Sequence, residues 1–213
     1  LKQSSRYFIS NEWKHALLSL ISQENFTLPQ AEERFNYTFQ SLIHLDAYFK
    51  HSIGLIMSVD QKSPILFYCP HQIWPYVPTR YQNEKNIVQR YQERGRNTYL
   101  IIGGNTYLDK QYKKIFHPKF FKIEIVPDFL IQRNTHITII GDIIIYTKLP
   151  HSIMVMIDDF YKQITSKEAS KEKLKKMIEV LEKKQKGKII IEHNSKKALQ
   201  YKKRFEKYFA EIY

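Results

Sequence analysis

The stretch "THITIIGDIIIYTKLP", from Thr135 to Pro150, decides the fold class. Isoleucine, threonine and tyrosine, which favour strands, stand on both sides of Gly141-Asp142, a dipeptide typical of tight turns. The pattern predicts a central β-hairpin whose isoleucines fill the core. His136 opens the first strand, so the hairpin could form the wall of a catalytic site or serve only as scaffold.

Strands and helices alternate on both sides of this hairpin. Runs rich in β-branched and aromatic residues predict further strands at 53–59, 64–69, 97–102, 120–126, 151–160 and 187–193. Helical spacing and charge predict helices at 83–95, 160–186 and 195–213. Such alternation is typical of a layered α/β domain, which we place at residues 51–213, with the helix at 160–186 as a strongly charged element within it.

Residues 1–50 indicate a separate helical segment. Thr27 is a candidate N-cap, Pro29 falls in the first turn, and Gln30 completes a capping-box pattern. The sequence therefore predicts a helix over residues 29–50, and we expect this helix to serve as a dimerisation linker.

The cysteine count and the hydropathy pattern indicate the compartment in which the protein is expected. The chain has 213 residues and a single cysteine, Cys69, so no disulfide can form within it and a reducing compartment is expected. No apolar run reaches the ~20 residues needed to cross a bilayer, and no signal-peptide pattern is present. We therefore expect a cytoplasmic protein without a membrane partner.

The positive charge is concentrated towards the end of the chain. The formal net charge is +13, and residues 162–213 alone carry 16 basic and 7 acidic side chains. This field favours nucleic acid or an acidic protein as a partner, although a solvated lysine-rich helix face is the alternative explanation. The candidate nucleic-acid contacts are the basic residues of the last helix: Lys196, Lys197, Lys202, Lys203, Arg204 and Lys207.

Motifs for cofactors and metals are missing. The glycine pair Gly103-Gly104 follows a predicted strand, but no G-x-G-x-x-G or phosphate-cradling loop occurs, so an ordinary turn is favoured. No two histidines have zinc-ligand spacing, and Cys69 with His71 supplies too few ligands. The sequence predicts neither a metal site nor a cofactor.

One motif points to phosphodiester chemistry. His117, Lys119 and Glu124 have the spacing His-x-Lys-(x)4-acid, which resembles the catalytic motif of phospholipase D-type enzymes. That resemblance implies a nucleophilic histidine and a lysine that holds phosphate, with His136 as the second histidine. Glutamate replaces the usual aspartate and no second copy of the motif follows, which favours coincidence.

The C-terminal half resembles the sensor domain of TrmB-like transcriptional regulators. The resemblance rests on "VPTRYQNEKNIVQRYQERG", "KIEIVPDF", the hairpin, and "KIIIEHNSKKALQYKKRFEKYFAEIY". It implies a phospholipase D-like fold, in which helices flank a mixed β-sheet. In active relatives the first hairpin strand carries His-x-Lys, whereas Thr138 follows His136 here, so the resemblance implies a non-catalytic version. The winged helix usual in that family is not found.

These observations predict a non-catalytic ligand-sensing and dimerisation domain of a transcriptional regulator. We expect a homodimer with its basic C-terminal surface near nucleic acid. Two alternatives remain open: a phosphodiesterase or nuclease of phospholipase D type, and a structural nucleoprotein subunit that binds polyanions through its lysine-rich tail.

Overall fold

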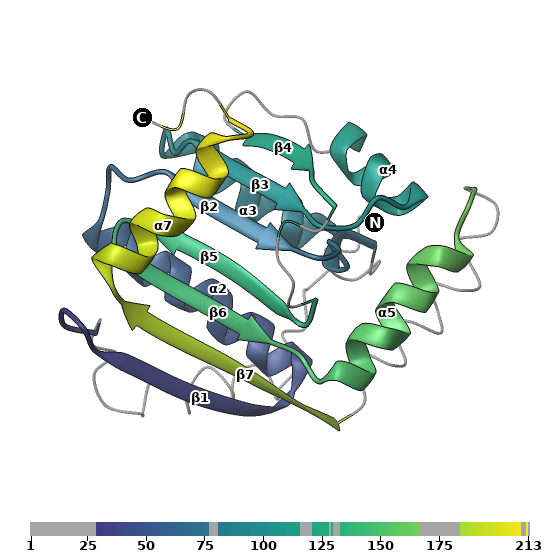
Figure 1. Cartoon of the computed structure of the whole chain (residues 1–213), viewed down its shortest axis with the longest axis horizontal. Coiled ribbons are helices and arrows are strands. Elements are labelled where there is room, and N and C mark those ends of the chain that lie inside the picture. The colour runs from purple at the N-terminus through teal and green to yellow at the C-terminus, as the bar shows by residue number, and fades with distance from the viewer. Residues whose placement is uncertain are drawn as a thin grey trace, which may run out of the picture.

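Seven strands form one mixed sheet in the order β1-β7-β6-β5-β2-β3-β4 (Figure 1). The computed structural model describes residues 29–76, 81–115, 121–127, 133–166 and 184–209, together with Phe129 and Ile212. The strands are β1 (Arg34–Ser41), β2 (Ile65–Cys69), β3 (Thr98–Ile102), β4 (Phe121–Ile125), β5 (Thr135–Ile140), β6 (Ile143–Lys148) and β7 (Lys184–His193). Strands β2, β3 and β4 run parallel, and all other neighbouring pairs are antiparallel.

Helices cover both faces of this sheet. They are α2 (Leu42–Val59), the short 3-10 helix η1 (Trp74–Tyr76), α3 (Tyr81–Glu93), α4 (Tyr107–Ile115), α5 (His151–Gln163) and α7 (Ser195–Glu206). Helix α7 crosses the front of the sheet and α2 and α3 lie behind it (Figure 1). We call these two sides the α7 face and the α2 face.

The hairpin forms as predicted. Strands β5 and β6 pair from Ile140 with Ile143 outwards, and Gly141 takes a φ of 56° in the turn, a conformation that favours glycine. Side chains alternate between the faces, so Ile145 packs with the core beneath α2 while Ile144 and Tyr146 pack with the core beneath α7. A strand buried on both faces explains the near-continuous isoleucine run. The α/β class and the mixed sheet flanked by helices are therefore confirmed.

The helix predicted over residues 29–50 is confirmed only from Leu42 onwards. Residues 34–41 form edge strand β1, which pairs with β7, and the helix begins only at Leu42, where the Ser41 hydroxyl accepts a hydrogen bond from the Ile43 N–H. The aromatic residues of β1 alternate with polar ones, which is the period of a strand. Tyr37 and Phe39 pack on Tyr48 of α2, with ring centroids 4.7 and 5.2 Å apart.

The predicted domain boundary after residue 50 falls inside α2, and β1 belongs to the same sheet as the rest of the chain. The other residues of the predicted helical segment, 1–28, lie outside the described part of the chain.

Two further predicted strands are helical. The runs at 53–59 and 151–160 belong to α2 and α5, because short apolar runs fit a buried helix as well as a strand. In α5 the buried residues Ile153, Ile157, Phe160 and Tyr161 recur at three- and four-residue spacing.

The charged helix predicted at 160–186 is only partly covered by the described residues. Helix α5 ends at Gln163 and β7 already begins at Lys184, while residues 167–183 are outside the described ranges. No helix in the described part of the chain is long and apolar enough to cross a membrane.

Candidate ligand site

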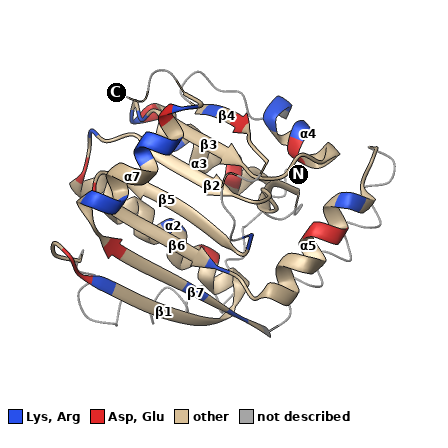
Figure 2. Cartoon of the chain, viewed as in Figure 1, with Lys and Arg blue, Asp and Glu red and all other residues tan. Residues whose placement is uncertain are grey.

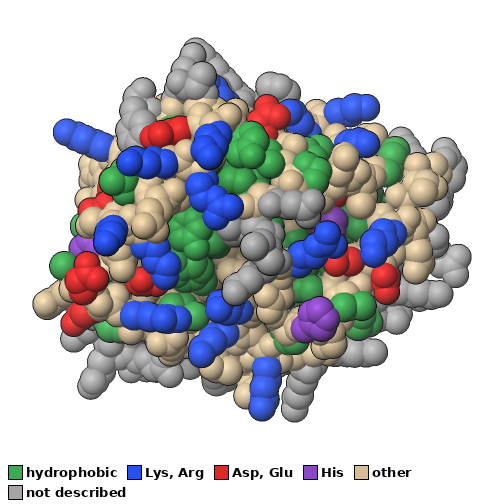
Figure 3. All heavy atoms as spheres, viewed as in Figure 1, with side chains coloured by type: hydrophobic (Ala, Val, Ile, Leu, Met, Phe, Trp, Pro, Cys, Tyr) green, Lys and Arg blue, Asp and Glu red, His purple; other side chains and the backbone are tan. Residues whose placement is uncertain are grey.

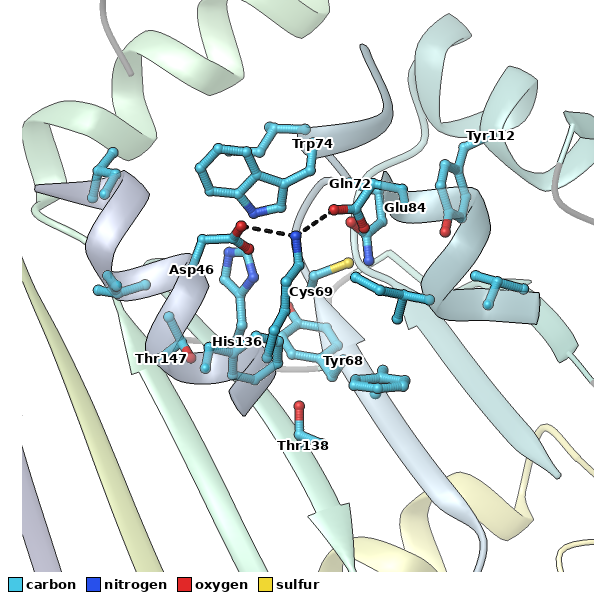
Figure 4. A pocket seen from close by; sticks show the side chains of 18 of the residues that line it. Asp46, Tyr68, Cys69, Gln72, Trp74, Glu84, Tyr112, His136, Thr138 and Thr147 are labelled. Atoms are coloured by element: carbon cyan, nitrogen blue, oxygen red, sulfur yellow. Dashed lines mark hydrogen bonds and ion pairs between the residues drawn. The ribbon is translucent and has the colours of Figure 1, made fainter. Parts of the chain in front are cut away.

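A cavity of about 100 Å³ lies between the α2 face of the sheet and helices α2 and α3 (Figure 4). Its wall is mostly apolar and includes Phe49, Phe67, Trp74 and Tyr91. A cavity of this size has room for several water molecules or a small organic ligand. Its polar groups come from elements far apart in the chain and are Asp46 and Lys50 of α2, Gln72, Glu84 of α3, His136 and Thr138 of β5, and Thr147 of β6.

Lys50 is held between two carboxylates at one side of the cavity (Figure 4). Its Nζ donates to Asp46 Oδ2 at 2.8 Å and also to Glu84 Oε1, and it lies 5.8 Å from the centre of the Trp74 ring. Burial by itself would lower the pKa of Lys50, but the attraction of Asp46 and Glu84 outweighs burial and raises the pKa. Lys50 therefore stays charged at neutral pH and cross-links α2 to α3.

His136 stands in the opposite wall with its imidazole directed into the cavity (Figure 4). Burial, with a smaller contribution from the charge of His71, lowers the pKa of His136 to about 4. The ring is therefore neutral at pH 7, with one nitrogen able to donate and the other able to accept. Within the described residues, no hydrogen bond uses either nitrogen.

Thr147 lies opposite His136 in the β5–β6 register. Its side chain lines the cavity and is only 6% exposed, yet its Oγ1 has no hydrogen-bond partner among the described residues. Buried polar atoms are almost always paired, and an unpaired one indicates an unseen partner such as water or a ligand. His136 and Thr147 therefore form an adjacent pair of unused polar groups in one cavity wall.

The described residues that line the cavity carry a small negative excess. Among them, Asp46 and Glu84 contribute two negative charges, Lys50 one positive charge, and neutral His136 none, which leaves one negative charge in excess. Such a site suits an uncharged or cationic molecule, because a phosphate would need unpaired cations.

The structure separates the two predicted catalytic residues that it describes, His136 and Glu124. His136 lies on the α2 face. Glu124 pairs across β3–β4 with Ile101, which packs beneath α7, so Glu124 projects from the opposite face. Glu124 also accepts from Lys113 Nζ at 2.7 Å, an ion pair open to solvent. His117 and Lys119 lie outside the described residues.

His71, which sequence reasoning passed over except as a weak metal ligand, is bound on both sides. Its Nδ1 lies 3.0 Å from Asp109 Oδ1, its Nε2 lies 3.1 Å from Asp158 Oδ1, and its ring stacks on Tyr161 at 4.1 Å. Both nitrogens can donate to these carboxylates only in the imidazolium form. His71 thus ties α4 and α5 to the end of β2 and is not a free partner for His136.

Gly104 packs against this cluster. A Cβ there would lie 2.3 Å from Asp109 Oδ2 and 2.4 Å from the His71 ring. The glycine pair after β3 therefore serves the close packing of a turn, as the sequence favoured.

Cys69 is buried in the cavity wall, and burial, with the charge of Asp109 as a smaller cause, raises the pKa of its thiol. The thiol therefore stays protonated and is not an activated nucleophile. Within the described residues no group of three histidine, cysteine, aspartate or glutamate side chains could hold a metal ion.

The six basic residues predicted to contact nucleic acid all lie on or just beyond α7, on the other face of the sheet (Figure 2). Three of them already have partners: Lys197 binds Glu192 at 3.0 Å, Lys202 lies 3.7 Å from Asp142, and Arg204 donates to the Phe129 carbonyl. The remaining three are exposed and have no ion-pair partner in the described part of the chain: Lys196, Lys203 and Lys207.

The cavity residues that sequence reasoning missed are Lys50, Glu84, Trp74 and Thr147. Asp46 and Lys50 carry a local signal, because a separation of four residues places both on one side of a helix. Glu84 is 34 residues from Lys50 and carries no such signal.

No protein-family model and no curated protein matches the sequence. Similar solved structures include TrmBL2, described as an archaeal chromatin protein with a novel mode of DNA binding (TM-score 0.45, 10% identity, 94% of this chain and 60% of that one). They also include NucT from Helicobacter pylori (TM-score 0.42, 12% identity, 82% and 95% covered). A third is Nuc from Salmonella typhimurium, a phospholipase D family member (TM-score 0.39, 11% identity, 82% and 93% covered). The chain thus spans less than two thirds of TrmBL2. These similarities are in the fold alone, and we draw no functional conclusion from them.

Proposed function

We propose that this chain is a non-catalytic ligand-binding domain whose ligand occupies the cavity on the α2 face. The observation that carries the proposal is the buried Thr147 hydroxyl beside neutral His136, neither of which has a hydrogen-bond partner among the described residues. The ligand would be a small uncharged or cationic molecule. It would place apolar surface against Trp74 and hydrogen-bond His136 and Thr147.

The cavity supports binding better than phosphodiester hydrolysis. That chemistry needs a cation free to hold phosphate and two histidines at one centre. Lys50 is already neutralised by two carboxylates, Thr138 stands where the resemblance would require lysine, and both nitrogens of His71 are engaged. The phosphodiesterase alternative retains its own test, which is activity on a generic phosphodiester lost in His117→Ala and His136→Ala.

The regulatory part of the proposal is that ligand occupancy biases contact with nucleic acid. Because α2 and α3 both line the cavity, a ligand bound there would favour one arrangement of these helices over another. The exposed cations Lys196, Lys203 and Lys207 on the far face would contribute to that contact. A homodimer remains part of the proposal, with a contact other than the predicted helix 29–50. Sedimentation equilibrium would test it, and a monomer at all concentrations would count against it.

A fluorescence screen tests the ligand site directly. In a Trp13→Phe background, Trp74 is the only tryptophan and reports from the cavity wall. We expect uncharged or cationic fragments to change Trp74 emission and raise the melting temperature, and anionic fragments to do neither. In His136→Phe, which keeps a ring but removes both nitrogens, affinity should fall about tenfold.

A matched variant, His151→Phe, removes an exposed histidine outside the cavity and should leave affinity unchanged. Fragments that bind His136→Phe as tightly as the parent protein would contradict the proposal. So would a screen in which only anionic compounds bind.

A further inference from the structure

A second depression lies on the α7 face, remote from the cavity. It has a volume of about 380 Å³ and a floor made by β5, β6 and β7, with one side of α7 as its wall. Tyr146 and Ile190 are paired across β6–β7 at the centre of the floor. Lys197, Tyr201 and Arg204 line the wall at four- and three-residue spacing along one side of the helix. We call this depression the α7 groove.

Positive charge surrounds the groove. Arg34 of β1, Lys148 of β6, and Lys197 and Arg204 of α7 supply four positive charges against the single carboxylate of Glu192, an excess of three. Figure 3 views this face and shows Lys and Arg side chains gathered around exposed hydrophobic surface. Neither Arg34 nor Lys148 has an ion-pair partner in the part of the chain that is described, so both cations are available to a ligand.

The groove also contains a buried polar atom without a partner. Tyr146 is 7% exposed, and although Tyr201 lies close, its hydroxyl has no partner within hydrogen-bond geometry among the described residues. Burial raises the pKa of Tyr146, with the neighbouring Tyr201 as a smaller cause, so the hydroxyl keeps its proton and remains a donor. Lys197 Nζ lies 5.1 Å from the centre of the Tyr146 ring and is held there by Glu192 at 3.0 Å.

We propose that the α7 groove binds a phosphate group, with Arg34 and Lys148 as its free cations and the Tyr146 hydroxyl as a neutral donor. Phosphate oxygens accept from guanidinium, ammonium and phenol groups alike, and a phosphate neutralises most of the excess charge. The phosphate could belong to a free nucleotide or to the backbone of single-stranded nucleic acid, since both present the same oxygens. This site is independent of the ligand proposed for the α2-face cavity.

Three probes distinguish the sources: inorganic phosphate, thymidine 5′-monophosphate and a fluorescein-labelled oligothymidylate. Binding is measured by calorimetry for the first two and by fluorescence anisotropy for the third, over a series of salt concentrations. Tighter binding of the monophosphate indicates a nucleotide ligand, and tighter binding of the oligomer indicates a nucleic-acid backbone. Failure of all three probes to bind at low salt would overturn the proposal.

Tyr146→Phe is the sharpest variant, because it removes only the unpaired oxygen. Since no hydrogen bond is lost, the free energy of unfolding should be unchanged or slightly higher, while affinity should fall about fivefold. Unchanged affinity in a folded Tyr146→Phe protein would overturn the role of the hydroxyl.

The charge test uses two matched double variants. Arg34→Ala with Lys148→Ala removes two cations from the groove, and Lys110→Ala with Lys114→Ala removes two exposed cations from α4, outside the groove. The groove variant should lose at least tenfold in affinity and show a smaller salt dependence, whereas the control should lose less than threefold. Equal losses of affinity in both variants would show that the ligand is attracted to the whole basic surface. That result would overturn the proposal of a phosphate site in the groove.

Discussion

The two faces of one sheet have opposite electrostatic character. The α2 face holds a cavity with aromatic walls, a lysine already bound by two carboxylates, and one negative charge in excess among its described lining residues. The α7 face holds the α7 groove, whose described lining residues carry three positive charges in excess. Adjacent residues of β6 contribute to both, because Thr147 points into the cavity while Tyr146 and Lys148 point into the groove.

The register of a strand therefore determines which of its residues face the cavity and which face the groove. Side chains along a strand alternate between the faces, so a slip of one residue in β6 would exchange the contents of cavity and groove. The hairpin turn at Gly141 fixes that register. Each site also contains a buried hydroxyl that has no hydrogen-bond partner within the described ranges, Thr147 on one face and Tyr146 on the other. The variants below are therefore chosen to disturb one face at a time.

The largest expected effect comes from removing the cation of the cavity. Lys50→Met removes the cation that Asp46, which is 2% exposed, and Glu84 share. We expect a loss of about 3 kcal/mol in the free energy of unfolding, measured by urea denaturation, because the attraction that offsets the burial of the two carboxylates is lost.

The matched control for Lys50 is Lys113→Met, which breaks the exposed pair with Glu124 and should cost less than about 0.5 kcal/mol. Adding Asp46→Asn and Glu84→Gln to Lys50→Met should recover most of the lost free energy of unfolding. If Lys50→Met and Lys113→Met lowered the free energy of unfolding equally, the ion pairs of Lys50 with Asp46 and Glu84 would be no more buried than a surface pair, which would contradict the account.

An intermediate effect is expected from the titration of His136. Its pKa is about 4 in the folded protein against an ordinary value of 6.5, so the unfolded chain binds more protons between these values. Stability should therefore fall as pH falls from about 6.5 towards 4, and His136→Asn should remove that part of the fall. We expect a difference of about 1 kcal/mol between pH 7 and pH 5, allowing for partial exposure of the ring.

Urea denaturation at a series of pH values measures this difference, with His151→Asn at an exposed position as the control. A pH dependence of stability that is identical in the parent protein and His136→Asn would contradict the burial of an uncharged His136 in the cavity wall.

The smallest effect is expected at Thr147. Thr147→Val keeps the shape of the side chain and removes an unpaired hydroxyl, so stability should be unchanged or rise by up to about 1 kcal/mol. Thr98→Val, at a buried position of β3, should instead cost about 1 kcal/mol, because the Thr98 hydroxyl donates to the Arg96 carbonyl. A loss in Thr147→Val as large as in Thr98→Val would reveal a partner for Thr147 within the protein itself.

The sequence predicted those parts of the fold that depend on local patterns. The hairpin, the parallel strands around residues 65–69 and 98–102, and the last helix have strong periodicity and were assigned correctly. Edge strand β1 was missed because a capping-box pattern before it suggested a helix, and α5 was missed because a short apolar run does not reveal its period.

The candidate site was predictable only in part. His136 was found because it opens the hairpin, but its partners come from elsewhere in the chain. Glu84 meets Lys50 across 34 residues, and Thr147 meets His136 only through the hairpin register. Glu124 was grouped with His117 and Lys119 by a motif spacing, and with His136 because the chemistry needs a second histidine. Neither argument takes account of the two faces of a sheet. Such groupings depend on strand order, which local sequence does not encode.

Methyl NMR of the isoleucines in β7 tests the division between the two faces most directly. Ile190 lies in the floor of the α7 groove, while its neighbours Ile189 and Ile191 face the core beneath α2. On titration with thymidine 5′-monophosphate, the methyl signals of Ile190 and Ile137 should shift, while those of Ile189 and Ile191 stay in place. Shifts at Ile189 and Ile191 with Ile190 unchanged would place the phosphate on the α2 face and contradict the account.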